Sequence, residues 1–101
     1  MPYKFLSLEK STIKNKKYTA KVLNTDTNRI NTIHFGDNKY EHYTDGHLDE
    51  KRKNAYINRH KDKENWTKTG ANTAGFWSYN YLWRFKTKKQ ALNFIKKMLN
   101  T

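Results

Sequence analysis

The stretch that decides the fold is Thr73 to Phe85, which reads T-A-G-F-W-S-Y-N-Y-L-W-R-F. It carries six aromatic residues between Phe76 and Phe85 and no acidic residue. In a chain of 101 residues, this much aromatic surface is either a core around which the other elements fold or a face that binds a partner.

The pattern of this stretch fits two kinds of secondary structure. Its aromatic residues alternate as in a strand with one aromatic face, at Trp77, Tyr79, Tyr81, Trp83 and Phe85. Thr73, however, stands where it could cap a helix, and the three-residue spacing from Phe76 to Tyr79 and Leu82 would stack along one. We predict a short helix.

A second helix is predicted from Thr87 to Leu99. Thr87 and Gln90 have the spacing of a capping box. The apolar residues that follow share one helical face, at Ala91, Leu92, Phe94, Ile95, Met98 and Leu99. This face needs a broad apolar surface to lie on, and the stretch Thr73 to Phe85 is the nearest one, which favours the core interpretation. We expect these core residues: Tyr56, Trp66, Phe76, Trp77, Leu82, Trp83, Leu92 and Ile95.

The first half of the chain has the short alternating patterns of strands. Lys17 to Leu23 and Arg29 to Phe35 flank the turn-forming residues N-T-D-T-N and predict a β-hairpin. Lys39 to Tyr43 is predicted to return as a third short strand after Gly36, and Tyr3 to Leu8 fits either a strand or an extended arm.

From Thr44 the pattern changes to that of a helix, with Asp45 or Asp49 as its cap. A thin apolar stripe of Leu48, Ala55, Tyr56 and Arg59 indicates packing along one side. Together these patterns predict an α+β fold over a single domain, residues 1–101, in which a small antiparallel sheet from the first half is packed by about three helices from the second.

The charge is uneven along the chain. The net charge is +12, with 21 Lys and Arg against 9 Asp and Glu. Lys10 to Lys21 holds five lysines and no acid, Val22 to Glu64 is neutral, and Asn65 to Thr101 holds seven basic residues and no acid. Surplus positive charge at the two ends predicts an acidic partner. The candidate contact residues are Lys10, Lys14, Lys16, Lys17, Lys21, Lys86, Lys88, Lys89, Lys96 and Lys97.

Several functional classes lack their signatures. The chain has no cysteine, no phosphate-binding glycine loop and no H-E-x-x-H pattern, so we expect no cofactor and no metal, and interpret His42, His47 and His60 as ordinary surface histidines. No apolar run approaches the roughly 20 residues that span a bilayer, and residues 1–10 lack the apolar segment of a signal peptide. We expect an intracellular protein without membrane insertion.

Arg59, His60 and Glu64 admit two interpretations. In a nuclease-like enzyme, His60 would act as base and Arg59 would hold a phosphate. In a purely structural role, Asp49, Arg52, Arg59 and Glu64 would form ion pairs that tie the helix to its surroundings. We expect the structural role and no enzyme activity.

An ordered series of motifs runs from Phe35 to Trp83: F-G, Y-x-x-Y-T, D-x-x-R-K-x-x-Y-I-x-R-H, E-N-W, T-A-G-F-W-S and L-W. In these the chain resembles a family of small basic uncharacterised proteins encoded by giant viruses and algal large double-stranded DNA viruses. The resemblance covers roughly the first 85 residues. The tail departs from it, because Arg84 to Thr87 stands where members often have a proline-bearing turn.

The resemblance implies a viral origin and no known activity. We therefore expect a non-enzymatic structural or virion-associated protein, a minor capsid or core component, whose basic surface contacts capsid protein or other virion proteins. The alternative is a protein that binds DNA or RNA through phosphate contacts, independently of sequence, during viral replication or packaging. The expected location is the virion, and the host cytoplasm or viral factory during infection.

Overall fold

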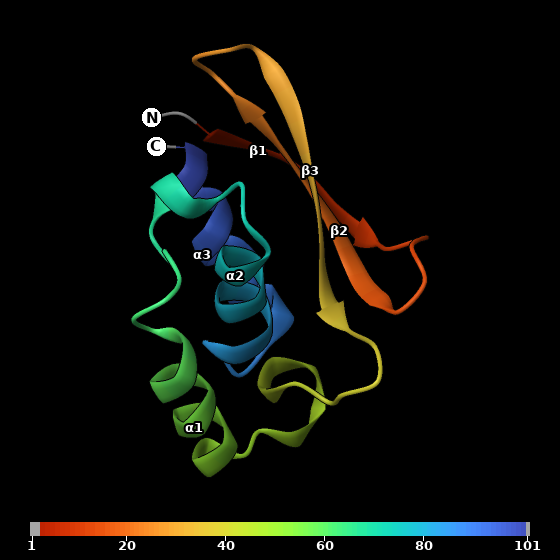
Figure 1. Ribbon diagram of the computed structural model, residues 1–101, viewed down its shortest axis with the longest axis vertical. Helices are drawn as coiled ribbons and strands as arrows, with labels where there is room; N and C mark the ends of the chain where they lie inside the picture. The colour runs from red at the N-terminus through yellow and green to blue at the C-terminus, as the bar shows by residue number, and fades with distance from the viewer. Residues whose placement is uncertain (1–2, 101) are drawn as a thin grey trace.

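A three-stranded antiparallel sheet forms the first part of the molecule, and the helices lie on one side of it (Figure 1). The computed structural model describes residues 3–100, apart from the side chain of Asp45. The elements follow one another as β1 (Tyr3–Lys10), β2 (Lys16–Asn24), β3 (Arg29–Asp37), the π-helix η1 (Tyr43–His47), α1 (Glu50–His60), a 3₁₀ turn η2 (Lys68–Gly70), α2 (Ala74–Trp77), the π-helix η3 (Ser78–Trp83) and α3 (Lys88–Asn100). The predicted α+β fold is therefore confirmed.

The sheet has strand order β1-β2-β3 and buries one face. Its inward rows include Leu8 opposite Ala20 and Ala20 opposite Ile33. Side chains alternate across a strand, so the same face also buries Val22 and Phe35. The predicted hairpin is confirmed in β2 and β3, and residues 3–10 form a strand and not an arm.

The aromatic stretch between Thr73 and Phe85 is helical, as predicted. The Thr73 hydroxyl oxygen accepts a hydrogen bond from the Phe76 N–H and caps α2, which continues without a break into η3. Trp77 is completely buried, and its ring lies 6.2 Å from that of Phe5 and 5.9 Å from that of Phe35. The aromatic stretch is therefore core, packed on the inner face of the sheet.

Asn80 joins this central helix to the chain around it. The side chain is fully buried, and its amide donates to the carbonyl oxygens of Trp66 (3.2 Å) and Phe76 (3.0 Å). Its own oxygen accepts from Arg84 Nη1 at 3.1 Å. A buried amide is stable only when its hydrogen bonds are made, so Asn80 holds the loop that carries Trp66 in place.

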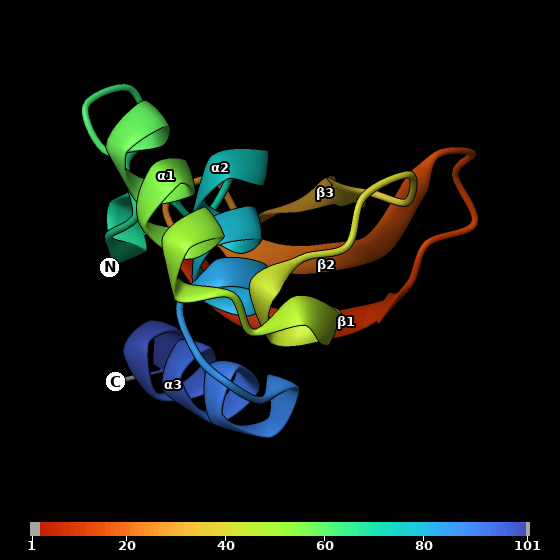
Figure 2. The same ribbon diagram turned by 90° about the horizontal axis from the view of Figure 1, so that it is seen from below.

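α3 lies beside β1, whereas α2 lies beside β3 (Figure 2). The Gln90 N–H donates to the Thr87 hydroxyl oxygen, which is half of the predicted capping box. Ala91, Ile95 and Leu99 are buried. The predicted apolar face of this helix is thus the face that packs against the core.

Three local predictions are wrong. Lys39 to Tyr43 is not a strand; it is a connection that leads into η1, and β1 supplies the third strand. His42 and Tyr43 are both buried, whereas a half-buried strand would expose one of two successive side chains. The expectation that His42 lies at the surface is therefore also wrong. The third concerns Leu48, which is predicted to lie on the apolar stripe of the next helix. It lies outside that helix at φ 50° with half of its surface exposed. The α-helix begins at Glu50, and Asp49, one of the two predicted caps, is confirmed as its cap.

The eight expected core residues all lie against one hydrophobic cluster. Six are buried, namely Tyr56, Phe76, Trp77, Leu82, Trp83 and Ile95. Trp66 and Leu92 are partly buried and pack against the others. The Trp66 ring stacks on Tyr79 at 3.8 Å, and its indole N–H donates to Glu64 Oε1.

Trp77→Ala is expected to lower the free energy of unfolding by about 3–5 kcal/mol, because it leaves a cavity between β1, β3 and α2. Urea denaturation followed by circular dichroism measures the change. Tyr40→Ala is the matched control, since Tyr40 is 65% exposed and its removal should change stability by no more than about 0.5 kcal/mol. Equal destabilisation of the two variants would contradict a core role for Trp77.

Candidate functional site

The two basic segments, which are far apart in the sequence, meet at Tyr18. The Lys88 ammonium at the start of α3 donates a hydrogen bond to the Tyr18 hydroxyl and lies 5.1 Å from the centre of its ring. Tyr18 is paired with Lys10 across β1 and β2. The start of α3 therefore adjoins the end of the sheet that carries the first lysine cluster.

The ten candidate lysines differ in exposure. Lys17 and Lys88 are half-buried, and Lys17 Nζ lies 2.9 Å from His42 Nδ1. Lys96 is exposed, although its ammonium lies 5.5 Å from the centre of the Phe5 ring. The remaining seven are also exposed: Lys10, Lys14, Lys16, Lys21, Lys86, Lys89 and Lys97.

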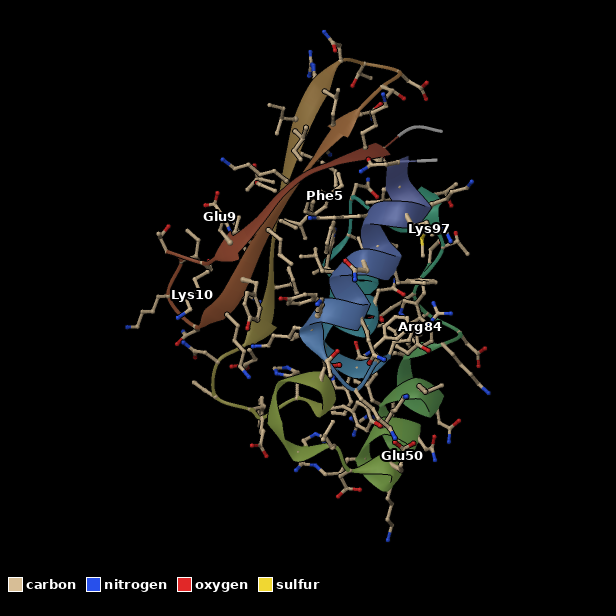
Figure 3. The ribbon with its side chains drawn as sticks, turned by 180° about the vertical axis from the view of Figure 1, so that it is seen from behind. Phe5, Glu9, Lys10, Glu50, Arg84 and Lys97 are labelled. Carbon is tan, nitrogen blue, oxygen red and sulfur yellow. The ribbon has the colours of Figure 1, made fainter. Side chains whose placement is uncertain are left out.

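These lysines do not form one compact patch. Lys10 at the hairpin end of β1 and Lys97 on α3 lie far apart, with Phe5 between the sheet and the helix (Figure 3). Lys21 belongs to the open face of the sheet, where it shares a shallow hollow with Lys10, Thr32 and His34. The basic surface is thus spread over the hairpin end, the open sheet face and α3.

A second feature is a groove of about 520 Å³ between α1 and the segment that follows β3. Aromatic side chains from three separate parts of the chain form its floor. Tyr56 stacks between His60, at 4.3 Å, and Trp83, at 4.5 Å and only 9° from parallel. His42 meets the Trp83 ring edge-on at 5.8 Å.

The rims of this groove carry charge. Its lining residues are Tyr40, Glu41, His42, Arg52, Ala55, Tyr56, Arg59, His60 and Trp83. Arg52 and Arg59 are exposed and seven residues apart on α1, so they lie on one side of the helix about 10 Å apart along its axis. Burial raises the pKa of the Tyr56 phenol, so this ring stays uncharged.

The ion pairs expected around α1 are mostly not formed. Asp49 accepts hydrogen bonds from the Lys51 and Arg52 N–H groups instead. Among the side chains that the structure describes, no carboxylate lies within 4.0 Å of Arg52 or Arg59, whereas His60 Nδ1 lies 3.0 Å from Glu64 Oε2. Arg59, His60 and Glu64, the set considered for a nuclease, do lie together at the end of α1.

The sequence alone does not identify the groove. Its patterns place Tyr40 and His42 in a strand, and Trp83 only in the core. One feature of the sequence does point to the groove: the spacing of Arg52, Tyr56 and Arg59 puts these three residues on one face of a helix. No spacing rule could bring Tyr40 or Trp83 to that face, because their meeting depends on tertiary packing.

Fold and surface define a small, strongly basic α+β protein with an aromatic core and a groove at its edge. Residues 6–60 match the model of a family of unknown function, DUF5754, so the chain belongs to this family. The match covers the sheet from Leu6 onward, η1 and α1. No curated protein and no solved structure matches the chain.

The described part of the chain contains neither a cluster of metal ligands nor a helix that could span a membrane. Among its side chains, no three from His, Asp or Glu are grouped so that they could hold a metal ion. Between residues 3 and 100, no helix has the length and apolar character needed to cross a bilayer.

His47 makes stability depend on pH. Its Nδ1 accepts the Asp49 N–H at 2.9 Å, and its Nε2 is buried without a hydrogen-bond partner among the described residues. Burial lowers the pKa of His47, and repulsion from Arg52 lowers it further, although Glu41 and Asp49 act in the opposite direction. The folded protein therefore binds this proton less readily than the unfolded chain.

The free energy of unfolding should accordingly fall as the pH is lowered from 7 through about 6.5, the ordinary pKa of histidine, because the unfolded state then takes up more protons. His47→Gln retains a side-chain acceptor and does not titrate, so its stability should fall less over the same range. Urea denaturation at several pH values measures both proteins. An identical decline in the variant would show that His47 is not responsible.

Proposed function

We propose that this protein is a non-enzymatic, virus-encoded structural component of a virus particle, a minor capsid or core component, which contacts an acidic partner through its exposed lysines. The ordered motifs between Phe35 and Trp83 support a viral origin by resemblance. The excess of positive charge supports the acidic partner.

One observation carries the proposal: the basic segments are joined into a single rigid frame. The Lys88 contact with Tyr18 connects α3 to β2, and the Lys96 ammonium lies over Phe5 of β1. Exposed lysines therefore project from both the sheet and α3 in fixed relative positions. Segments 10–21 and 65–101 contain no acid that could neutralise them from within.

The basic residues of these two segments indicate how the surface would contact an acidic partner. Apart from Arg84, every basic residue of these two segments is a lysine. A lysine acts as a point charge and lacks the two-pronged geometry of arginine. Such a surface suits phosphates or carboxylates spread over a broad partner and does not select a sequence. Capsid protein, other virion proteins and packaged DNA or RNA are all partners of this chemistry.

Mass spectrometry of purified particles tests the location. The protein is expected at a constant copy number per particle that survives protease treatment of the particle exterior. Absence from particles, with abundance in infected cells, would contradict the proposal and favour a nucleic-acid-binding protein that acts in replication or packaging.

Replacing Lys86, Lys89 and Lys97 together by glutamine should weaken binding to the acidic partner and reduce its salt dependence. If that partner is duplex DNA, the slope of log K against log salt should become shallower by about 0.9 for each phosphate that the variant no longer neutralises. The matched control replaces Lys51, Lys61 and Lys63, which belong to the neutral middle of the chain. Titrations with duplex DNA and with purified capsid protein at several salt concentrations measure both sets. Equal effects would show that total charge matters and the proposed surface does not.

A further inference from the structure

We propose that the groove between α1 and residues 40–42 binds a segment of single-stranded nucleic acid, with Arg52 and Arg59 on the phosphates and Tyr40 stacked on a base. This goes beyond the proposed function, because it assigns a ligand to a second surface. None of the ten candidate lysines lines the groove, although Lys17 contacts His42, which does.

The first argument is that Arg52 and Arg59 are exposed and not engaged in ion pairs with the described side chains. They are separated by two turns of α1, about 10 Å, with the small side chain of Ala55 between them. Two guanidinium groups at this distance suit successive anionic groups on one chain better than a single shared phosphate.

The second argument is the aromatic character of the groove. Its floor is the stack of His60, Tyr56 and Trp83, held rigid by burial of Tyr56 and Trp83. On the opposite rim, Tyr40 is 65% exposed. An exposed ring beside a positively charged groove is the arrangement that binds unpaired bases, since every base has a flat face that can stack.

The third argument is the balance of charge. Among the nine lining residues Glu41 is the single acid, against Arg52 and Arg59. The Glu41 side chain packs over Gly46 of η1 and fills the space that a Cβ would need there. The groove is therefore positive where a ligand would enter.

These features distinguish a single strand from a duplex. In a duplex the bases are stacked on one another, so Tyr40 could not reach a base face, and only phosphates would be available. Exposed lysines elsewhere on the molecule already offer phosphate contacts without a groove. An aromatic groove with arginines on its rim suits a ligand that presents both phosphates and free bases.

Fluorescence anisotropy with labelled oligodeoxythymidylate, and with the same strand paired to oligodeoxyadenylate, tests the proposal. The double variant Arg52→Gln and Arg59→Gln should bind the single strand about 10- to 100-fold more weakly. Its slope of log K against log salt should be shallower by about 1.4, which corresponds to two phosphate contacts on a single strand. The control, Lys51→Gln with Lys61→Gln, removes the same charge from other sides of α1 and should change affinity far less.

Tyr40→Ala separates stacking from charge. It should weaken single-strand binding about 5- to 100-fold and leave duplex binding unchanged. Because Tyr40 is exposed, the variant should fold normally, which a thermal melt can verify.

Three outcomes would overturn the proposal. The arginine and lysine variants could be weakened equally, or Tyr40→Ala could leave single-strand binding unchanged. Alternatively, polyglutamate could displace the oligonucleotide as well as an unlabelled strand of equal charge does, which would assign the groove to an acidic protein segment. None of these outcomes decides whether the protein is present in virus particles, so the two proposals can fail separately.

Discussion

The central helix, from Ala74 to Trp83, is enclosed by other elements, and the rest of the structure depends on this burial. Trp77 packs between Phe5 and Phe35, so it joins the helix to two different strands. Leu82 is completely buried, and α3 packs on the same segment from another direction. A helix with this many large aromatic side chains is stable in water only when other elements cover most of them. The sheet and α3 provide that environment, which explains why a chain with so few apolar residues forms a core.

The enclosure also explains why the alternating aromatic pattern is ambiguous. Strict alternation identifies a strand only when one face is exposed to solvent. In this helix four successive residues, Asn80, Tyr81, Leu82 and Trp83, are all buried, so burial does not follow the alternation of the aromatic residues. The wider turn of the π-helix η3 belongs to the same segment, and π-helical turns are often found at functional sites. Trp83, its last residue, forms the floor of the groove.

Particular residues show how far sequence reasoning can reach. The β2–β3 hairpin and the apolar face of α3 are predictable because each buries one side, and one-sided burial leaves a period in the sequence. The strand predicted for residues 39–43 is wrong because five residues are too few to establish a period, and because His42 and Tyr43 are buried by contacts with Trp83, Lys17 and Glu50 that lie elsewhere in the chain. The groove escapes prediction for the same reason, since only tertiary packing brings residues 40–42, α1 and Trp83 together.

The core and the groove share one aromatic system, and this has a consequence for any ligand. Trp83 is anchored in η3, Tyr56 stacks on it, and His60 stacks on Tyr56 in turn. The floor is therefore as rigid as the core, and binding need not order it. Side chains on the rims, Arg52, Arg59 and Tyr40, are exposed and contribute little to packing. A surface built in this way loses less conformational entropy on binding than one made of flexible loops, because only the rim side chains have to be immobilised. Changes at the rim can therefore alter affinity while the fold stays intact, whereas changes at the floor affect both together.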